Sequence, residues 1–186
     1  MVMPIIAYGD PVLKKVSEDI DENYPNLKEL INDMFETMYD SNGVGLAAPQ
    51  INRSIRLFIV DASPYAEEDE ALEGFKKVFI NPIILEEEGR EWTFNEGCLS
   101  IPGIREDVRR KPRVLIEYYD ENFNLKEETY EGLAARILQH EYDHIEGILF
   151  TDRINPLRRR LLKGKLNDIA KGKVDIDYKM KFPLLK

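Results

Sequence analysis

Both histidines of the chain, His140 and His144, lie four residues apart in the stretch QHEYDH. On a helix, residues with this spacing lie one above the other, so two imidazoles can bind one metal ion. Glu141 directly follows the first histidine, where a glutamate can act as general base on a water held by the ion. The pattern therefore predicts a metal-dependent hydrolytic site. Two histidines on a helix surface, with no shared function, are the alternative.

A catalytic site of this kind takes three protein ligands and leaves a fourth position open. The chain has no third histidine and no glutamate after Glu146, and Asp152 is the nearest downstream carboxylate. The only cysteine, Cys98, lies upstream and is the better candidate, because a thiolate is a strong ligand for iron or zinc. The turn signal Pro102-Gly103 shortly after it indicates that a strand gives way to a loop there. A lone cysteine can also be a buried apolar residue, and Asp152 is not excluded as a ligand.

Three segments form an ordered set: GVGLAAPQ (43–50), EGCLS (96–100) and QHEYDH (139–144). Together they closely resemble the peptide deformylase family, and the likeness extends from Pro4 to about Pro156. One departure is Asn52, which stands where many members have glycine. Asparagine also tolerates a positive φ, so we expect the turn to persist.

The resemblance implies an enzyme that removes the formyl group from the N-terminal formyl-methionine of newly made polypeptides and releases formate. It implies one divalent metal ion held by Cys98, His140 and His144, with water in the open fourth position. Fe²⁺ is the expected native ion, and Zn²⁺, Ni²⁺ or Co²⁺ can occupy the site. Because zinc binds a given site more tightly than ferrous iron, iron occupancy would reflect availability.

The resemblance also implies roles for other residues. Glu141 would take a proton from the water and deliver it to the leaving amine, while Gln50 and the backbone N–H of Leu99 would stabilise the oxyanion. Gly45, with Val44 beside it, would bind the substrate backbone like an added strand. The candidate residues for the methionine pocket, which can equally be ordinary core residues, are Phe94, Leu133 and Ile137.

Two other functions compete with this interpretation. A metalloprotease of another class is the main alternative, although the missing downstream ligand argues against it. A binding domain with a degenerate site is less favoured, because the candidate catalytic set is intact.

Glu96 with Arg110 resembles an ion pair that supports the site, and a surface pair is nearly as good an interpretation. Asp143 and Tyr142 either support the site or lie on the helix surface.

The net charge of −9 is unevenly distributed. From Arg153 onward there are 11 Lys and Arg against 3 Asp, a net charge of +8, whereas the first 152 residues hold 15 basic and 32 acidic residues, a net charge of −17. We expect a basic C-terminal helix and tail over about 156–186 that helps to bring the chain to the ribosome, where its nascent substrate emerges. A solvated helix face is the alternative. No pattern indicates sequence-specific binding of nucleic acid.

The length of 186 residues suits a single catalytic domain over 1–186. No apolar run approaches the roughly 20 residues of a membrane span, and the first residues lack the basic region of a secretory signal. One cysteine excludes an intrachain disulfide, which suits a reducing compartment. We therefore expect a cytoplasmic protein with no membrane partner.

Apolar residues recur at helical spacing in 27–39 and 132–148. A last helix is predicted over about 156–171, because Pro156 suits the first position of a helix. Segments rich in β-branched and aromatic residues predict strands at 56–61, 76–85, 90–94, 113–120 and 125–131. The acidic segment 62–74 is expected to be a solvated loop, whose role the sequence leaves open. Strands grouped between helices, without regular βαβ alternation, favour an α+β fold. We expect antiparallel and mixed sheets packed around a central metal-binding helix, with a C-terminal helix.

Overall fold

The computed structural model describes residues 1–185. Its helices are α1 (Leu27–Asp40), α2 (Gly132–Ile145) and α3 (Pro156–Ala170). Its strands are β1 (Ile5–Ile6), β2 (Gly45–Ala47), β3 (Leu57–Asp61), β4 (Lys76–Glu88), β5 (Trp92–Cys98), β6 (Ile101–Arg110), β7 (Arg113–Tyr119), β8 (Leu125–Glu131) and β9 (Met180–Lys181). Short 3₁₀ turns lie at Pro11–Lys14, Ala48–Ile51, Ser63–Tyr65, Glu70–Leu72 and Phe150–Asp152.

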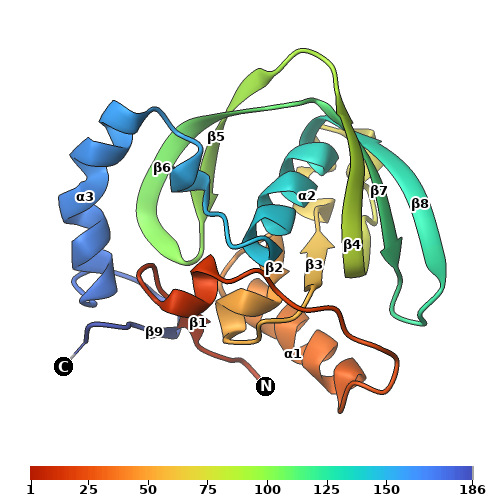
Figure 1. Ribbon diagram of the computed structural model, residues 1–186, viewed down its shortest axis with the longest axis horizontal. Coiled ribbons are helices and arrows are strands. Elements are labelled where there is room, and N and C mark those ends of the chain that lie inside the picture. Colours follow the sequence, from red (N-terminus) through yellow and green to blue (C-terminus); the bar gives the residue numbers. More distant parts are fainter. Residues whose placement is uncertain (186) are drawn as a thin grey trace.

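Two antiparallel layers enclose α2. One is a five-stranded sheet in the order β2-β3-β4-β7-β8, and the other is the hairpin β5-β6. Figure 1 shows α2 between this hairpin and the strands β4, β7 and β8, with α3 on the far side of β6. The short strands β1 and β9 pair in parallel, so the molecule contains both kinds of pairing. The predicted α+β fold, with its central and C-terminal helices, is confirmed.

Helix α2 occupies the centre because one of its faces is apolar and another is polar. Leu138 and Ile145 are fully buried and pack with Phe58 and Phe79 of the large sheet. Burying one such side chain contributes about 1.5–3 kcal/mol. The polar residues of α2, described below, face the β5-β6 hairpin. A helix buried on both sides can hold polar groups in a fixed orientation between the two layers.

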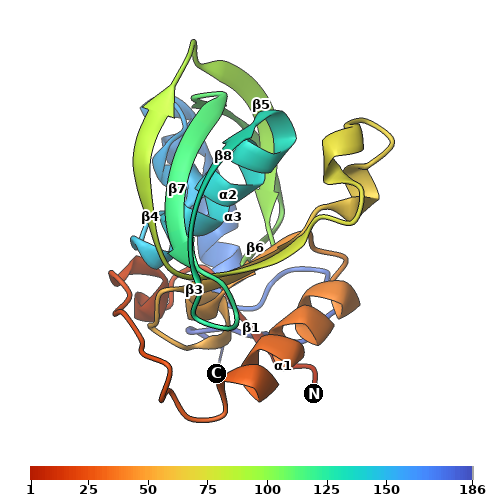
Figure 2. The ribbon, with the colours of Figure 1, turned by 90° about the vertical axis from the view of Figure 1, so that its right-hand side faces the viewer.

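The predicted apolar stripe of α1 is buried as expected, with Met34 and Met38 fully covered. Helix α1 packs against β2 and β3 and so supports the segment that follows it, residues 41–47. The acidic segment 62–74 forms two short 3₁₀ turns and projects from the body (Figure 2). Within residues 1–185, no helix is long and apolar enough to cross a membrane.

The C-terminal segment returns to the body after α3. Leu162, Leu166 and Ile169 of α3 pack against the β6 side of the molecule, in the cluster that contains Val108. The chain then runs back to pair β9 with β1, beside the N-terminal segment (Figure 1). The predicted helix over 156–171 is thus confirmed to within one residue. Of the basic segment 156–186, Lys186 lies outside the described residues.

Candidate metal centre and active site

The two histidines and the cysteine come together from different parts of the chain. The ligand atoms of Cys98, His140 and His144 lie within 4.8 Å of one another, and Cys98 Sγ is 3.4 Å from His144 Nε2. Cys98 ends β5, as the sequence indicated, and both histidines lie on α2. One thiolate and two imidazoles form a donor set that suits zinc or ferrous iron. The residues present therefore fit a divalent metal ion.

The two histidines differ in the hydrogen bonding of their Nδ1 atoms. His140 Nδ1 lies 2.9 Å from Glu96 Oε1, so an Nδ1–H donates to the carboxylate. The other ring nitrogen, Nε2, lies 3.9 Å from Glu141 Oε1. His144 is buried, and within residues 1–185 its Nδ1 has no hydrogen-bond partner. Burial, together with nearby cationic groups, holds the pKa of His144 well below its usual value. The neutral imidazole that results is the form that binds metal.

Glu96 is the centre of a buried ionic network. Arg110 donates to both of its oxygens at 2.7 and 3.0 Å, and Arg136 Nη1 donates at 2.7 Å. Burial alone would raise the pKa of Glu96, but the hydrogen bonds from His140 and Arg110 outweigh it and hold this pKa well below its usual value. Glu96 therefore stays ionised and can keep accepting from His140. The suspected pair with Arg110 lies in the interior and not on the surface.

Asp143 extends this network. Arg110 Nη1 donates to its carboxylate at 2.8 Å, and Arg153 donates at 2.5 and 2.7 Å. Arg110 therefore links two buried carboxylates and joins β6 to α2. Tyr142 lies elsewhere, with its hydroxyl 3.5 Å from Arg56. Of the two residues that the sequence left open, Asp143 supports the site and Tyr142 does not contact it.

Glu141 is a buried carboxyl group beside the ligands. The residue is 4 % exposed, its Oε1 lies 3.9 Å from His140 Nε2, and its Oε2 has no hydrogen-bond partner within residues 1–185. Burial raises the pKa of Glu141 to about 7. A carboxyl group with such a pKa can both accept and return a proton near neutral pH.

Gly45 approaches Glu141 so closely that any larger residue would displace the Glu141 side chain. A Cβ at this position would lie 2.9 Å from the carboxyl carbon of Glu141, closer than real contacts allow. Gly45 begins β2, which is the first strand in the order of the large sheet and so exposes one edge. Gly45 is therefore part of an edge strand of the large sheet and also contacts the buried carboxyl group of Glu141.

Gln50, in the 3₁₀ turn Ala48–Ile51, points its side chain toward Cys98. Its Oε1 accepts from the N–H of Ala47 at 3.0 Å, which turns its Nε2 toward Ser100 Oγ at 3.1 Å and Cys98 Sγ at 3.5 Å. The 3₁₀ turn that carries Gln50 ends at Asn52, whose φ is +65°. The expectation that asparagine would preserve a left-handed turn here is confirmed.

Leu99 follows the cysteine in the turn between β5 and β6. Within residues 1–185, its backbone N–H makes no hydrogen bond to another backbone group. Its side chain packs toward Gly43, where a Cβ would lie 2.8 Å from Leu99 Cδ1. The turn that carries the cysteine thus touches the segment that leads into β2.

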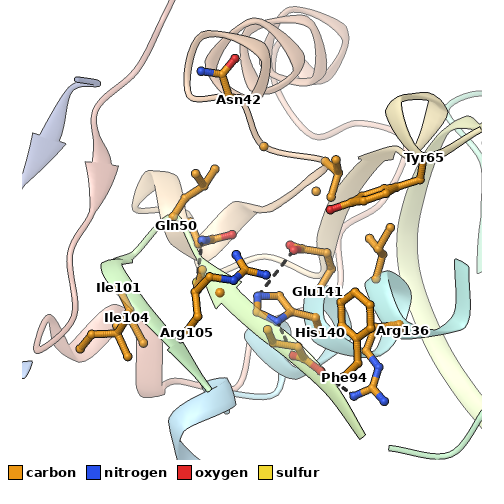
Figure 3. Close-up of a pocket in the computed structure, with 18 of the residues that line it drawn as sticks. Asn42, Gln50, Tyr65, Phe94, Ile101, Ile104, Arg105, Arg136, His140 and Glu141 are labelled. Atoms are coloured by element: carbon orange, nitrogen blue, oxygen red, sulfur yellow. Dashed lines mark hydrogen bonds and ion pairs between the residues drawn. The ribbon is translucent and has the colours of Figure 1, made fainter. Parts of the chain in front are cut away.

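One cavity of about 420 Å³ is lined by Gln50, Cys98, Leu99, His140 and Glu141 (Figure 3). His144 is not among its lining residues. Of the candidate binding residues, the cavity is lined by Val44, Gly45, Phe94 and Ile137. Leu133 is not among the lining residues and packs half-buried against the core around Leu138.

The cavity also contains side chains that sequence reasoning missed, namely Tyr65, Arg105 and Arg136. Tyr65, Phe94 and Arg136 lie on one side of it and Ile101 and Ile104 on the other (Figure 3). The position of Arg136, one helical turn before His140, was a usable signal. For Tyr65, the only signal in the sequence was the presence of an aromatic residue within the acidic segment 62–74.

A central helix with a Cys-His-His set and an adjacent buried glutamate, covered by two antiparallel layers, defines a metal-dependent hydrolase. The family model for polypeptide deformylase matches residues 2–160. A peptide deformylase of Christiangramia forsetii is 58% identical, over 100% of this chain and 98% of its own. A second, of Flavobacterium psychrophilum, is also 58% identical, over 97% of each chain. A crystal structure of a peptide deformylase from Legionella pneumophila superposes with a TM-score of 0.80 at 39% identity, covering 93% of this chain and 98% of that one.

The chain belongs to the peptide deformylase family. It is an enzyme that hydrolyses the N-formyl group from the N-terminal formyl-methionine of newly made polypeptides. The family is metal-dependent, in agreement with the Cys-His-His group. The resemblance drawn from the three motifs is confirmed, and the alternative of another metalloprotease class is set aside.

Proposed function

We propose that Cys98, His140 and His144 hold one divalent metal ion, natively Fe²⁺, and that Zn²⁺, Ni²⁺ or Co²⁺ can replace it. The clustering of the three donors and the lowered pKa of His144 support this assignment. Glu96 supports it further, because a carboxylate that accepts from Nδ1–H fixes the ring and makes the other nitrogen a better ligand. When bound, the ion would supply Lewis-acid chemistry, polarising water and the formyl oxygen.

We further propose that the nascent chain binds as an extended strand along the open edge of β2. Val44 and Gly45 would then offer backbone groups to the peptide, as in other cases of strand addition. The methionine side chain would enter the cavity beside Phe94 and Ile137, both of which line it. Leu133 would bound this pocket indirectly, one turn before Ile137 on α2.

We also propose how protons move during the reaction. Glu141, as carboxylate, takes a proton from the water that attacks the formyl carbon. The resulting oxyanion accepts hydrogen bonds from Gln50 Nε2–H and from the N–H of Leu99, and one such donor can be worth about 3–4 kcal/mol. Glu141 then returns its proton to the methionine nitrogen as the carbon–nitrogen bond breaks. The products are formate and a free amino terminus.

One observation carries this proposal: Glu141, whose Oε2 has no hydrogen-bond partner within residues 1–185, lines the same cavity as Cys98, His140 and Gly45. The test is anaerobic purification, with metal analysis and a formate-release assay on formyl-Met-Ala-Ser made on the same sample. We expect one divalent ion per chain and formate release that a chelator abolishes and added Fe²⁺, Ni²⁺ or Co²⁺ restores. Full metal occupancy without formate release would exclude the proposal.

We propose, in addition, that the chain works in the cytoplasm as a single catalytic domain and docks on ribosomes through its basic C-terminal segment. A groove of about 1090 Å³ along α3 supports this idea. Its walls include Lys14, Arg159, Arg160 and Lys163, with Asp152 as the one acidic lining residue among residues 1–185. Such a concentration of positive charge favours phosphate-rich partners such as ribosomal RNA.

A further inference from the structure

The tail of the chain contacts the catalytic turn directly. The hydroxyl of Tyr178 donates to the backbone carbonyl of Leu99 at 2.7 Å, across 79 positions of sequence. Tyr178 is partly buried and packs in the same apolar cluster as Leu99. It lies outside residues 2–160, the part of the chain that matches the family model. The motifs near the metal centre therefore do not account for this contact.

Tyr178 is attached to a well-anchored segment. Two residues further on, β9 pairs in parallel with β1, and Ile5 N–H donates to the carbonyl of Lys179 at 2.9 Å. At the other end of the tail, Leu184 N–H donates to the carbonyl of Ala170 at 2.9 Å. Because these bonds fix the backbone on both sides of β9, the phenol ring has little freedom to move away from Leu99.

The turn at Leu99 and Ser100 is held from outside by three groups. The N–H of Tyr8 donates to the carbonyl of Ser100 at 2.9 Å, and Gln50 donates to the Ser100 hydroxyl at 3.1 Å. Tyr178 supplies the third bond, and within residues 1–185 it is the only side chain that donates to the Leu99 carbonyl. A two-residue turn has few internal bonds, so such external contacts decide the orientation of its peptide planes.

The Leu99 carbonyl and the Leu99 N–H belong to adjacent peptide planes, which are rigid units joined at one Cα. Fixing the carbonyl limits the rotation of Leu99 and thereby limits the direction of its N–H. The side chain of Leu99 packs against the apolar cluster and toward Gly43, and these contacts do not bond its backbone. Beside the β5-β6 pairing of Cys98 with Ile101, Tyr178 is therefore the side-chain contact that restricts the direction of this donor.

We propose that Tyr178 is a positioning residue for deformylation, whose hydroxyl keeps the Leu99 N–H oriented toward the developing oxyanion. The inference rests on the proposed role of that N–H. Removing an oxyanion donor outright costs about 100- to 1000-fold in kcat, and a donor that is present but loosely held should cost less. Loss of the Tyr178 hydroxyl is therefore expected to lower kcat by about 5- to 30-fold, by that comparison.

The test compares Tyr178→Phe with the wild type in the full-length enzyme loaded with Ni²⁺. Phenylalanine keeps the ring and the packing, so only the hydroxyl bond is lost. The matched control is Tyr24→Phe, because the Tyr24 hydroxyl pairs with Arg53 at 3.1 Å on the surface and outside the cavity. The measurements are kcat and KM for formyl-Met-Ala-Ser, the thermal midpoint, and amide hydrogen exchange of Leu99 in the metal-free and loaded proteins.

The expected result for Tyr178→Phe is a lower kcat with KM within twofold of wild type and faster exchange of the Leu99 amide. The thermal midpoint should fall by no more than about 4 °C, the effect of losing one hydrogen bond. Tyr24→Phe should match wild type throughout. An unchanged kcat would overturn the inference while leaving the deformylase mechanism in place. A fall in kcat that only accompanies a larger fall in the thermal midpoint and a higher KM would also overturn it, because it would show a purely structural role. Absence of formate release by the wild type would instead refute the proposed function.

Discussion

Glu96 and His140 form the link between the buried ionic network and the candidate metal site, through the 2.9 Å contact of Oε1 with Nδ1. The same carboxylate is held by Arg110 and Arg136. Because three elements, β5, β6 and α2, each contribute a member, the orientation of the imidazole depends on the packing of the two layers around α2. The orientation of His140 in the candidate metal site therefore depends on packing in the interior of the fold.

Replacing Glu96 with Gln should weaken both the fold and the metal site. The change removes the negative charge between two buried arginines, and breaking such a pair costs about 3–5 kcal/mol in the free energy of unfolding. Metal affinity should fall by about 10- to 100-fold, since His140 loses its anionic partner. Urea unfolding and a metal-binding titration measure the two effects.

The matched control for this substitution is Glu91→Gln. Glu91 lies 3.8 Å from Arg109, and both side chains are largely exposed. Such a pair contributes at most about 1 kcal/mol. Equal effects of the two substitutions on metal affinity would show that Glu96 has no special relation to His140.

Substituting Gly45 with Ala should impair catalysis and leave the fold intact. The added methyl group would meet the Glu141 carboxyl at 2.9 Å, so the carboxyl group must shift. A displacement of about 1 Å can cost about 100-fold in rate, which we expect for kcat/KM. Circular dichroism and formate release check the two halves of this prediction.

Gly164→Ala is the control for the glycine substitution. Gly164 lies in α3, its φ is not positive, and a Cβ there would meet nothing within 4 Å. This variant should keep full activity and gain about 0.5–1 kcal/mol of stability, because glycine is a poor helix former. If Gly45→Ala were as active as Gly164→Ala, the close approach of Gly45 to Glu141 would have no catalytic consequence.

Stability should fall at alkaline pH because of a buried phenol away from the active site. Burial, and then a hydrogen bond to Glu128, hold the pKa of Tyr118 above its ordinary value of about 10. The folded state thus keeps a proton that the unfolded state releases. The stabilisation is present below pH 10 and is lost as the pH rises above that value.

Urea unfolding of wild type and Tyr118→Phe at pH 8 and pH 11 measures this effect. The wild type should lose more of its free energy of unfolding between these two pH values than the variant does. Equal losses would contradict the assigned role of Tyr118. The comparison reports Tyr118 together with its effect on Tyr130, whose pKa is raised by burial and then by the neighbouring Tyr118.

Charge removal on α3 should weaken ribosome binding without affecting free substrates. The double substitution Arg160→Gln/Lys163→Gln removes two positive charges from the groove. The slope of log affinity against log salt should decrease by about 1.5, since each phosphate contact contributes about 0.7–0.9. Cosedimentation with ribosomes over a salt series measures this slope, and formate release from a free peptide should not change.

The matched control for the ribosome experiment is Lys28→Gln/Lys126→Gln, which removes the same charge from α1 and β8, outside the α3 groove and away from α3 (Figure 1). This variant should sediment like wild type. Equal weakening by both double substitutions would indicate general electrostatic attraction and would contradict docking through α3. Substitution is preferable to truncation here, because the tail that follows α3 carries Tyr178.

The long elements could be predicted from the sequence because their patterns are local. The stripe of α1 and the strands β3, β4, β7 and β8 follow from periodicity and from β-branched content. Strand β6 was missed because Pro102-Gly103 is typical of a turn and because charged residues interrupt its apolar positions. Strands β2 and β9 were also missed, since each has three residues or fewer and exists only through pairing with a distant segment.

The metal ligands could be predicted because cysteine and histidine are rare in this chain. A single cysteine and two histidines left few choices for ligands, and the motif order supplied Gln50 and Glu141. Arg136 and Tyr178 were not predicted, because their importance comes from three-dimensional contacts with Glu96 and Leu99. Leu133 was placed in the pocket by helical spacing, but the structure packs it toward the core. Spacing identifies a face of α2 and does not fix where the cavity ends.

The most direct test of the mechanism is formate release by Glu141→Gln, measured beside wild type with the metal content of both samples. Glutamine preserves the shape of the side chain but cannot take up the proton. The mechanism predicts equal metal occupancy and a fall in kcat of about 100- to 10,000-fold, the usual contribution of a general acid-base group. A fully metallated Glu141→Gln enzyme that releases formate at the wild-type rate would contradict it.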